Sequence, residues 1–176
     1  MSGRPAVFLD RDGTINVASV RDGKPHPPVS LAELVLVPGA SAAIAALRQS
    51  GYCTIVVTNQ PDVATGKQRR EVVEAINQAL MSRLMLDDIR VCYHVDADGC
   101  NCRKPKPGML LAATRDWNID LGRSFMIGDR WRDVEAGRAA GCRTLLIESG
   151  YGERRSEPDF SVASLVEGCN IILNMR

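Results

Sequence analysis

The sequence lacks any long hydrophobic run. No segment of its 176 residues approaches the roughly 20 consecutive apolar residues of a membrane-spanning helix, and the N-terminus shows no signal-peptide pattern. A surplus of charge is also missing, since 22 basic and 21 acidic residues give a formal net charge of +1. Such a chain has little to attract nucleic acid or an anionic membrane surface. We therefore expect a cytoplasmic protein that binds neither of them.

Repeats, low-complexity tracts and linkers are absent too. Apolar runs alternate instead with segments of helical spacing. Strands are predicted at 6–9, 54–57, 89–93, 124–127 and 144–147, and helices at 40–49, 69–85, 108–117 and 132–140. This alternation predicts a doubly wound, Rossmann-like α/β fold with a parallel sheet, in one domain over residues 1–176. Residues 17–36 are predicted as an ordered loop and residues 162–173 as a last helix or strand. No stretch is long enough for a large cap domain, so the site should be open.

Polar side chains follow four of the predicted strands, at the sheet edge where open α/β sheets bind ligands. In chain order they are Asp10 and Asp12; Thr58, Asn59 and Gln60; Arg103 and Lys104; and Asp129 and Arg130. The first two carboxylates would repel each other unless a cation or a shared proton relieves them. Carboxylates can attack phosphorus and can bind Mg²⁺, while hydroxyl and ammonium groups can donate to phosphate oxygens. The set therefore suits cleavage of a phosphate ester.

Each of these motifs also has a plainer interpretation when it is taken alone. The D-x-D pair could be a turn or a helix cap, and Asp129 could cap the helix that follows it. Thr58 and Asn59 could simply form a turn. These interpretations together would require one sheet edge to gather polar residues by accident, so we favour the catalytic one.

A second constellation is the stretch "CYHVDADGCNC", which contains Cys92, His94, Cys100 and Cys102. Three thiolates and an imidazole at this spacing suit tetrahedral Zn²⁺, and four protein ligands leave no open position. We therefore predict a structural zinc loop at residues 92–102, which would also hold the adjoining Lys104 in place. The alternatives are free thiols with a surface histidine, or a redox pair.

Four motifs in order now resemble those of the haloacid dehalogenase (HAD) phosphohydrolase superfamily. They are "DRDGT", "VVTN", the lysine after "CR", and "GDRWRD". The resemblance implies Asp10 as nucleophile, Asp12 as general acid and base, and Thr58 and Lys104 as donors that stabilise the moving phosphoryl group.

The same resemblance implies a magnesium site. Mg²⁺ would be held by Asp10, Asp129 and the backbone carbonyl of Asp12, and Asp133 would support these ligands from behind. The complete motif set speaks against a zinc-stapled binding module that has lost its activity.

The zinc loop narrows the resemblance to two small, capless groups: heptose 1,7-bisphosphate 7-phosphatases and histidinol-phosphate phosphatases. "CRKPKPGM" is closer to the heptose group. This implies a small phosphorylated sugar as substrate, with Arg103 gripping the sugar or its second phosphate and with Asn59, Gln60 and Arg130 as further substrate-binding residues. A monomer is expected, because the sequence has no pronounced apolar stripe.

One stretch departs from the heptose pattern. "NQPDVATG" has Pro61 and Asp62 where that group has Ser-Gly, and Thr65 where it has arginine. The basic residues Arg21, Lys24 and His26 of the 17–36 segment could replace the lost charge. Asp62 could instead bind an amine, which is the feature that favours histidinol phosphate.

Overall fold

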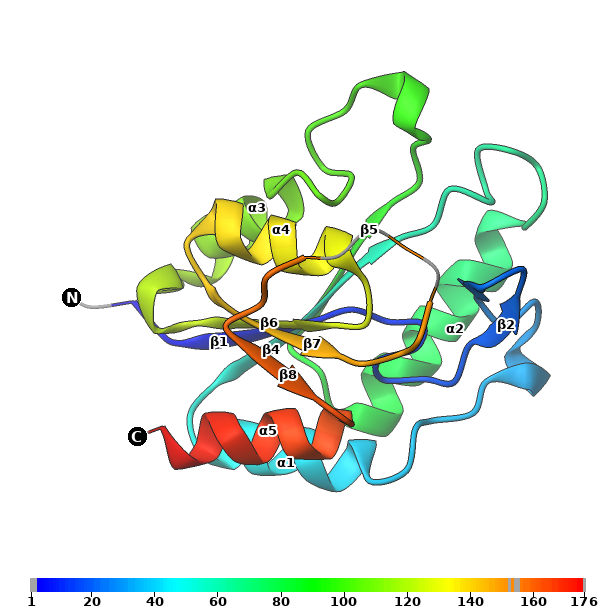
Figure 1. Cartoon of the computed structure of the whole chain (residues 1–176). Helices are drawn as coiled ribbons and strands as arrows, with labels where there is room; N and C mark the ends of the chain where they lie inside the picture. Colours follow the sequence, from blue (N-terminus) through cyan, green and yellow to red (C-terminus); the bar gives the residue numbers. More distant parts are fainter. Residues whose placement is uncertain (1–2, 152, 154–155, 176) are drawn as a thin grey trace.

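Six parallel strands form the central sheet of the protein (Figure 1). The computed structural model describes residues 3–151, 153 and 156–175. The strands lie in the order β5-β4-β1-β6-β7-β8. They are β1 (Ala6–Leu9), β4 (Cys53–Asn59), β5 (Asp88–Cys92), β6 (Phe125–Gly128), β7 (Arg143–Ile147) and β8 (Phe160–Val162). The chain runs outward from β1 to one side and then returns to build the other, so the β1–β6 junction is the switch point where such sheets bind ligands.

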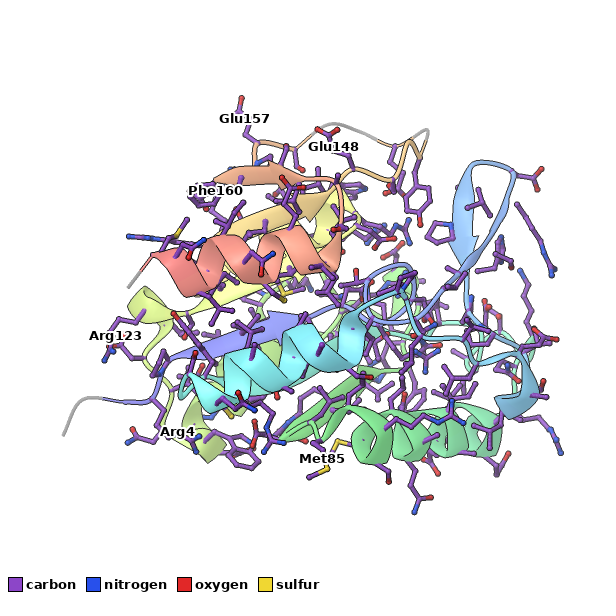
Figure 2. All side chains as sticks on the ribbon, turned by 90° about the horizontal axis from the view of Figure 1, so that it is seen from below. Arg4, Met85, Arg123, Glu148, Glu157 and Phe160 are labelled. Carbon is purple, nitrogen blue, oxygen red and sulfur yellow. The ribbon has the colours of Figure 1, made fainter. Side chains whose placement is uncertain are left out.

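Helices cover both faces of this sheet. One face carries α1 (Ala40–Gln49), α2 (Arg70–Leu84) and α5 (Leu165–Asn174), which Figure 2 shows from below, and the other carries α3 (Gly108–Trp117) and α4 (Trp131–Ala140). The side chains of β1 alternate between the two cores: Val7 and Leu9 pack in one, Ala6 and Phe8 in the other. Both faces of β1 are therefore buried, as its uninterrupted apolar run predicts.

The predicted α/β fold is confirmed. Every strand and helix that the periodicity predicts is present, with bounds that differ by at most two residues at an end. The tail is more elaborate than a single helix or strand, because it forms β8 and then α5. Three short 3-10 turns, η1 (Leu31–Glu33), η2 (Asp96–Asp98) and η3 (Leu121–Arg123), complete the elements.

The 17–36 segment is not the plain loop that its prolines indicate. It contains a β-hairpin of β2 (Ser19–Arg21) and β3 (Lys24–His26), which pair with each other and lie apart from the main sheet. The turn is Asp22-Gly23, and both residues have positive φ angles, 50° and 67°. An Asp-Gly pair is a strong hairpin signal in sequence, so this element could have been predicted.

Among the described residues, no helix is long and apolar enough to cross a membrane.

Candidate active site

Three carboxylates converge at the β1–β6 junction. Asp10 directly follows β1, Asp129 directly follows β6, and Asp133 lies in the first turn of α4. One oxygen atom from each of the three lies within 4.8 Å of the other two. All three side chains are buried, with 8%, 3% and 2% of their residue surfaces exposed. Burial makes this arrangement costly unless cations compensate the charge.

Lys104 supplies one such cation. Its Nζ donates to Asp10 Oδ1 at 2.6 Å and to Asp133 Oδ1 at 2.5 Å, and the residue is 2% exposed. The neighbouring Asn59 fixes the lysine backbone from both sides, because its Nδ2 donates to the Lys104 carbonyl at 3.0 Å and its Oδ1 accepts from the Lys104 N–H at 3.1 Å. The lysine is therefore positioned through both its backbone and its side chain.

Asp133 also caps a helix. Its Oδ2 accepts from the Arg130 N–H at 3.1 Å, which satisfies a backbone donor at the start of α4. The capping interpretation considered for Asp129 therefore belongs to Asp133. Asp129 instead accepts a hydrogen bond from the Tyr151 hydroxyl at 2.7 Å on Oδ2.

The charges of this cluster perturb one another. Burial, followed by the nearby charges of Asp10 and Asp133, raises the pKa of Asp129 well above its usual range. Burial and the charge of Asp10 raise the pKa of Asp133 to about 6, although Lys104 opposes this shift. Three carboxylates and one ammonium group sum to a charge of −2 when all are ionised. A divalent cation bound to oxygen ligands would neutralise the cluster, so these residues fit Mg²⁺.

Asp12 points to different partners. Its carboxylate accepts from Arg11 Nε at 3.2 and 3.1 Å, from Asn16 Nδ2 at 3.0 Å and from Gln60 Nε2 at 2.8 Å. The same Gln60 nitrogen lies 3.0 Å from Thr58 Oγ1. Arg11 itself is fully buried and donates to Asn77 on α2 at 2.8 Å. This network fixes the Asp12 side chain next to, but outside, the group of three carboxylates.

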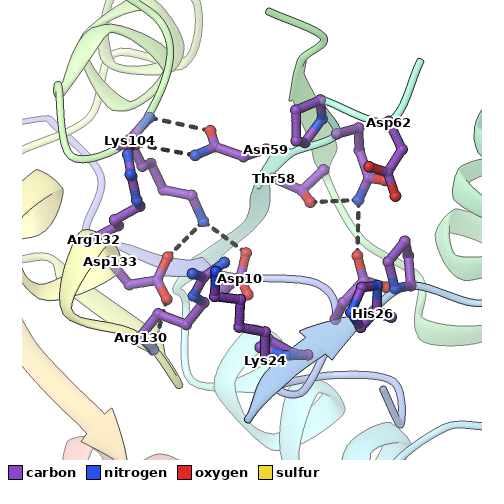
Figure 3. Close-up of a pocket in the computed structure, with 15 residues that line it drawn as sticks. Asp10, Lys24, His26, Thr58, Asn59, Asp62, Lys104, Arg130, Arg132 and Asp133 are labelled. Atoms are coloured by element: carbon purple, nitrogen blue, oxygen red, sulfur yellow. Dashed lines mark hydrogen bonds and ion pairs between the residues drawn. The ribbon is translucent and has the colours of Figure 1, made fainter. Parts of the chain in front are cut away.

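Asp10, Asp12 and Asp133 line a cavity of about 170 Å³ (Figure 3). Its inner wall holds these three acids together with Lys104, Thr58, Asn59 and Gln60. The opposite wall comes from the β2–β3 hairpin, which contributes Lys24 and His26. Asp62, Arg130 and Arg132 complete the rim. The site therefore has no large cap, but it is less open than the sequence predicts, because the hairpin covers one side.

The Cys/His cluster lies beside this cavity. The Sγ atoms of Cys92, Cys100 and Cys102 are 3.3, 3.4 and 3.8 Å apart, and His94 Nδ1 lies 3.3 Å from Cys102 Sγ and 3.6 Å from Cys92 Sγ. Ligands about 2.3 Å from a tetrahedral metal lie about 3.8 Å apart, so this spacing fits Zn²⁺.

Comparisons with known proteins agree with this geometry. A family model described as HAD-hydrolase-like matches residues 101–167. A D-glycero-beta-D-manno-heptose-1,7-bisphosphate 7-phosphatase of Rhodopseudomonas palustris is 39% identical over 157 residues, covering 82% of this chain and 84% of the relative. The phosphatase of the same name from Pseudomonas aeruginosa is 38% identical, covering 86% and 85%.

A solved structure decides the fold family. The D,D-heptose 1,7-bisphosphate phosphatase from B. bronchiseptica, complexed with magnesium and phosphate, superimposes with a TM-score of 0.84 at 30% identity, covering 98% of this chain and 99% of that one. A putative HAD-like phosphatase from Mesorhizobium loti gives 0.78 at 31% identity, covering 99% and 86%. The chain belongs to the heptose-1,7-bisphosphate 7-phosphatase family of HAD hydrolases. It is a phosphoric monoester hydrolase.

In this HAD phosphatase, one arginine that the sequence predicts at the substrate does not line the cavity, and one that it does not predict there does. Arg103, the predicted substrate-binding residue, is not among the residues that line the cavity. Its Nε donates to Asp96 Oδ1 at 2.7 Å and its Nη1 to the His94 carbonyl at 3.2 Å. Arg132, which the sequence analysis did not single out, lines the cavity and donates to the Lys104 carbonyl at 3.2 Å.

Three further residues of this HAD phosphatase were missed from the sequence. Arg11 and Asn77 position Asp12, and Tyr151 bonds to Asp129. Asn77 could have been identified from the sequence, because it is a polar residue on the otherwise apolar face of α2 that also carries Val73 and Leu80. Tyr151 could not have been identified in this way, since it comes from an irregular segment after β7.

Proposed function

We propose that this phosphatase removes one phosphate from a small sugar bisphosphate, D-glycero-D-manno-heptose 1,7-bisphosphate, at its 7-position. The observation that carries the proposal is the buried group of Asp10, Asp129 and Asp133 bonded to Lys104 at the switch point of the sheet. The names of the relatives supply the substrate.

The chemistry that we propose begins with Asp10. One of its carboxylate oxygens attacks phosphorus, the bond from phosphorus to the sugar oxygen breaks, and Asp12 gives its proton to the departing alcohol. Asp12 then takes a proton from water, whose oxygen attacks the aspartyl phosphate and releases inorganic phosphate and free Asp10. Thr58 and Lys104 donate to the phosphoryl oxygens during both steps.

Two metals complete the proposal. Asp10, Asp129 and the Asp12 carbonyl would hold Mg²⁺, which when bound supplies positive charge to the phosphoryl oxygens. Asp133 is part of the same group of carboxylates, and we assign it the supporting position because it already bonds to Lys104 and to the start of α4. Cys92, His94, Cys100 and Cys102 would hold structural Zn²⁺.

The second phosphate of the substrate needs a cation that is free to bind it. The basic groups around the cavity are mostly paired: Lys104 with Asp10 and Asp133, Arg130 with Glu153, and Arg132 with Asp96. In the described part of the chain, Lys24 and His26 have neither an ion pair nor a side-chain hydrogen bond. Both line the cavity from the hairpin. We therefore assign them to the phosphate that is not cleaved.

Asp62 supports a second candidate, histidinol phosphate. Its carboxylate lines the same cavity and could bind the amine of that substrate. The choice depends on whether the free groups of the hairpin or Asp62 contact the part of the substrate that remains after cleavage.

A phosphate-release assay with magnesium tests both candidates. Both anomers of the heptose bisphosphate, the heptose 7-phosphate and histidinol phosphate are compared with wild-type protein and with Asp10→Asn. We expect the bisphosphate to have the highest kcat/KM and D10N to be inactive but folded. Preference for histidinol phosphate would refute the substrate, and near-normal turnover by D10N would refute the covalent step.

Lys24→Met tests the hairpin assignment in the same assay. We expect KM for the bisphosphate to rise about tenfold or more, since a charge-assisted hydrogen bond contributes about 1.5–3 kcal/mol. The kcat/KM for the heptose 7-phosphate should not change, because that molecule lacks the second phosphate. Equal effects on both substrates would contradict the assignment.

Three further expectations also stand as proposals: the single domain, the monomer and the cytoplasmic location. Two continuous cores that share one sheet support the single domain.

A further inference from the structure

A segment after β7 fastens the end of β6 from outside the cavity. Every second residue of this segment bonds to Asp129 or Arg130: Ser149 Oγ donates to the Asp129 carbonyl at 3.1 Å, Tyr151 Oη donates to Asp129 Oδ2 at 2.7 Å, and Glu153 pairs with the Arg130 guanidinium. We call these three residues the strap. The side chains of all three therefore converge on the two residues that follow β6.

The strap makes the two oxygens of Asp129 unequal. Oδ2 is occupied by the Tyr151 hydroxyl, whereas Oδ1 is buried and has no hydrogen-bond partner among the described residues. A buried carboxylate oxygen without a partner is unfavourable, so the site is built for something that binds there. The grouping of Asp129 with Asp10 and Asp133 within 4.8 Å indicates a cation.

We infer that Tyr151 is a positioning residue for the magnesium ligand Asp129. Its hydroxyl holds Oδ2 and thereby leaves the buried Oδ1, which has no hydrogen-bond partner among the described residues, to bind the ion. The inference rests on the proposed magnesium site. Hydrogen-bond donors behind a metal ligand fix its orientation, and their removal typically lowers metal affinity by 10–100-fold.

The packing around the contact supports this role. A Cβ atom on Gly13 would lie 2.0 Å from Asp129 Oδ2 and 2.9 Å from the Tyr151 hydroxyl oxygen. Gly13 has a φ of +85°, a conformation that glycine adopts without strain. The Gly13 backbone therefore packs against one side of the Asp129 carboxylate, and the Tyr151 phenol binds it on another side. Asp129 has little freedom to rotate.

The test is Tyr151→Phe, which removes a single oxygen atom. We expect the magnesium concentration for half-maximal activity to rise about tenfold or more, while kcat at saturating magnesium stays near the wild-type value. Mn²⁺ binding, measured by electron paramagnetic resonance without substrate, should weaken by the same factor. Tyr52→Phe is the matched control, because Tyr52 precedes β4, packs edge-on against the Phe125 ring and belongs to neither the cavity lining nor the strap.

A second variant separates the phenol from the rest of the strap. Glu153→Gln weakens the pairing with Arg130 and leaves the Tyr151 hydroxyl in place, so Mn²⁺ affinity should not change. An unchanged Mn²⁺ affinity in Tyr151→Phe would overturn the inference, as would an equal loss in both variants. Failure of the wild-type protein to bind Mn²⁺ would instead overturn the proposed magnesium site, so the two failures are distinguishable.

Discussion

Replacing Lys104 by methionine should be the most damaging single change in the site. The ammonium group lies 2.6 Å from Asp10 Oδ1 and 2.5 Å from Asp133 Oδ1, with only 2% of the residue exposed. At an effective dielectric constant of about 20, each contact corresponds to a gross attraction of about 6 kcal/mol, which the cost of burying the charges largely offsets. Methionine removes the attraction but leaves the carboxylates buried. Breaking such a pair from one side costs about 3–5 kcal/mol.

This magnitude predicts a specific pattern of stability. Small domains unfold with about 5–15 kcal/mol, so K104M in a chelator should lose a large part of its stability. Added magnesium should stabilise K104M more than wild type, because the variant cluster carries one more uncompensated negative charge. Activity should fall about 10²–10³-fold even at saturating magnesium, since one donor to the phosphoryl group is gone.

Urea unfolding in chelator and in magnesium, together with phosphate release, measures these effects. Lys67→Met serves as the control, because Lys67 is exposed and lines no part of the cavity. An unfolding free energy of K104M within about 1 kcal/mol of wild type in chelator would refute the argument from buried charge. Retention of more than about a tenth of the activity would refute the role of Lys104 at the phosphoryl group.

Three other outcomes follow from the same geometry. Gly13→Ala should impair magnesium binding and lower the melting temperature, because its Cβ would lie 2.0 Å from Asp129 Oδ2; a variant with wild-type magnesium dependence would contradict this contact. Elemental analysis should find about one zinc per chain, and Cys92→Ser should lose it and become protease-sensitive within 92–102; full protection in the variant would contradict a zinc-folded loop. In chelator, the melting temperature should be higher at pH 5 than at pH 7.5. The pKa values of Asp129 and Asp133 in the folded protein (about 6 for Asp133) exceed the value of an unfolded aspartate, so the stability that their protonation contributes is present at low pH and is lost as the pH rises through the folded pKa. Magnesium should therefore raise the melting temperature more at pH 7.5 than at pH 5. An equal rise at both pH values would contradict the coupling.

The sequence predicts that Asp10, Asp129 and Lys104 lie close together, because parallel strands bring their carboxyl ends to one edge of the sheet. Asp10 and Asp129 directly follow two adjacent strands, and that relation depends only on strand order. The partners of Arg103 could not be predicted, because they depend on the path of the 92–102 loop, where Asp96 and the His94 carbonyl accept from the guanidinium.

Contacts made by residues outside the main sheet and its helices were the least accessible to sequence reasoning. The cavity-facing position of Lys24 depends on how the hairpin folds back over the sheet edge, which no periodicity reports. Tyr151 lies 22 positions after Asp129 in the chain, and the strap has neither helical nor strand periodicity to predict that contact.

The threefold attachment of Asp133 affects how mutagenesis of this enzyme can be interpreted. One oxygen accepts from Lys104, the other accepts from the Arg130 N–H just before α4, and the carboxylate is itself one of the three grouped acids. A variant at position 133 would release a catalytic lysine, fray a helix and alter a metal environment in a single step. Its kinetic defect would therefore be a composite, and only parallel measurements on Lys104 and Asp129 variants could divide it among the three causes.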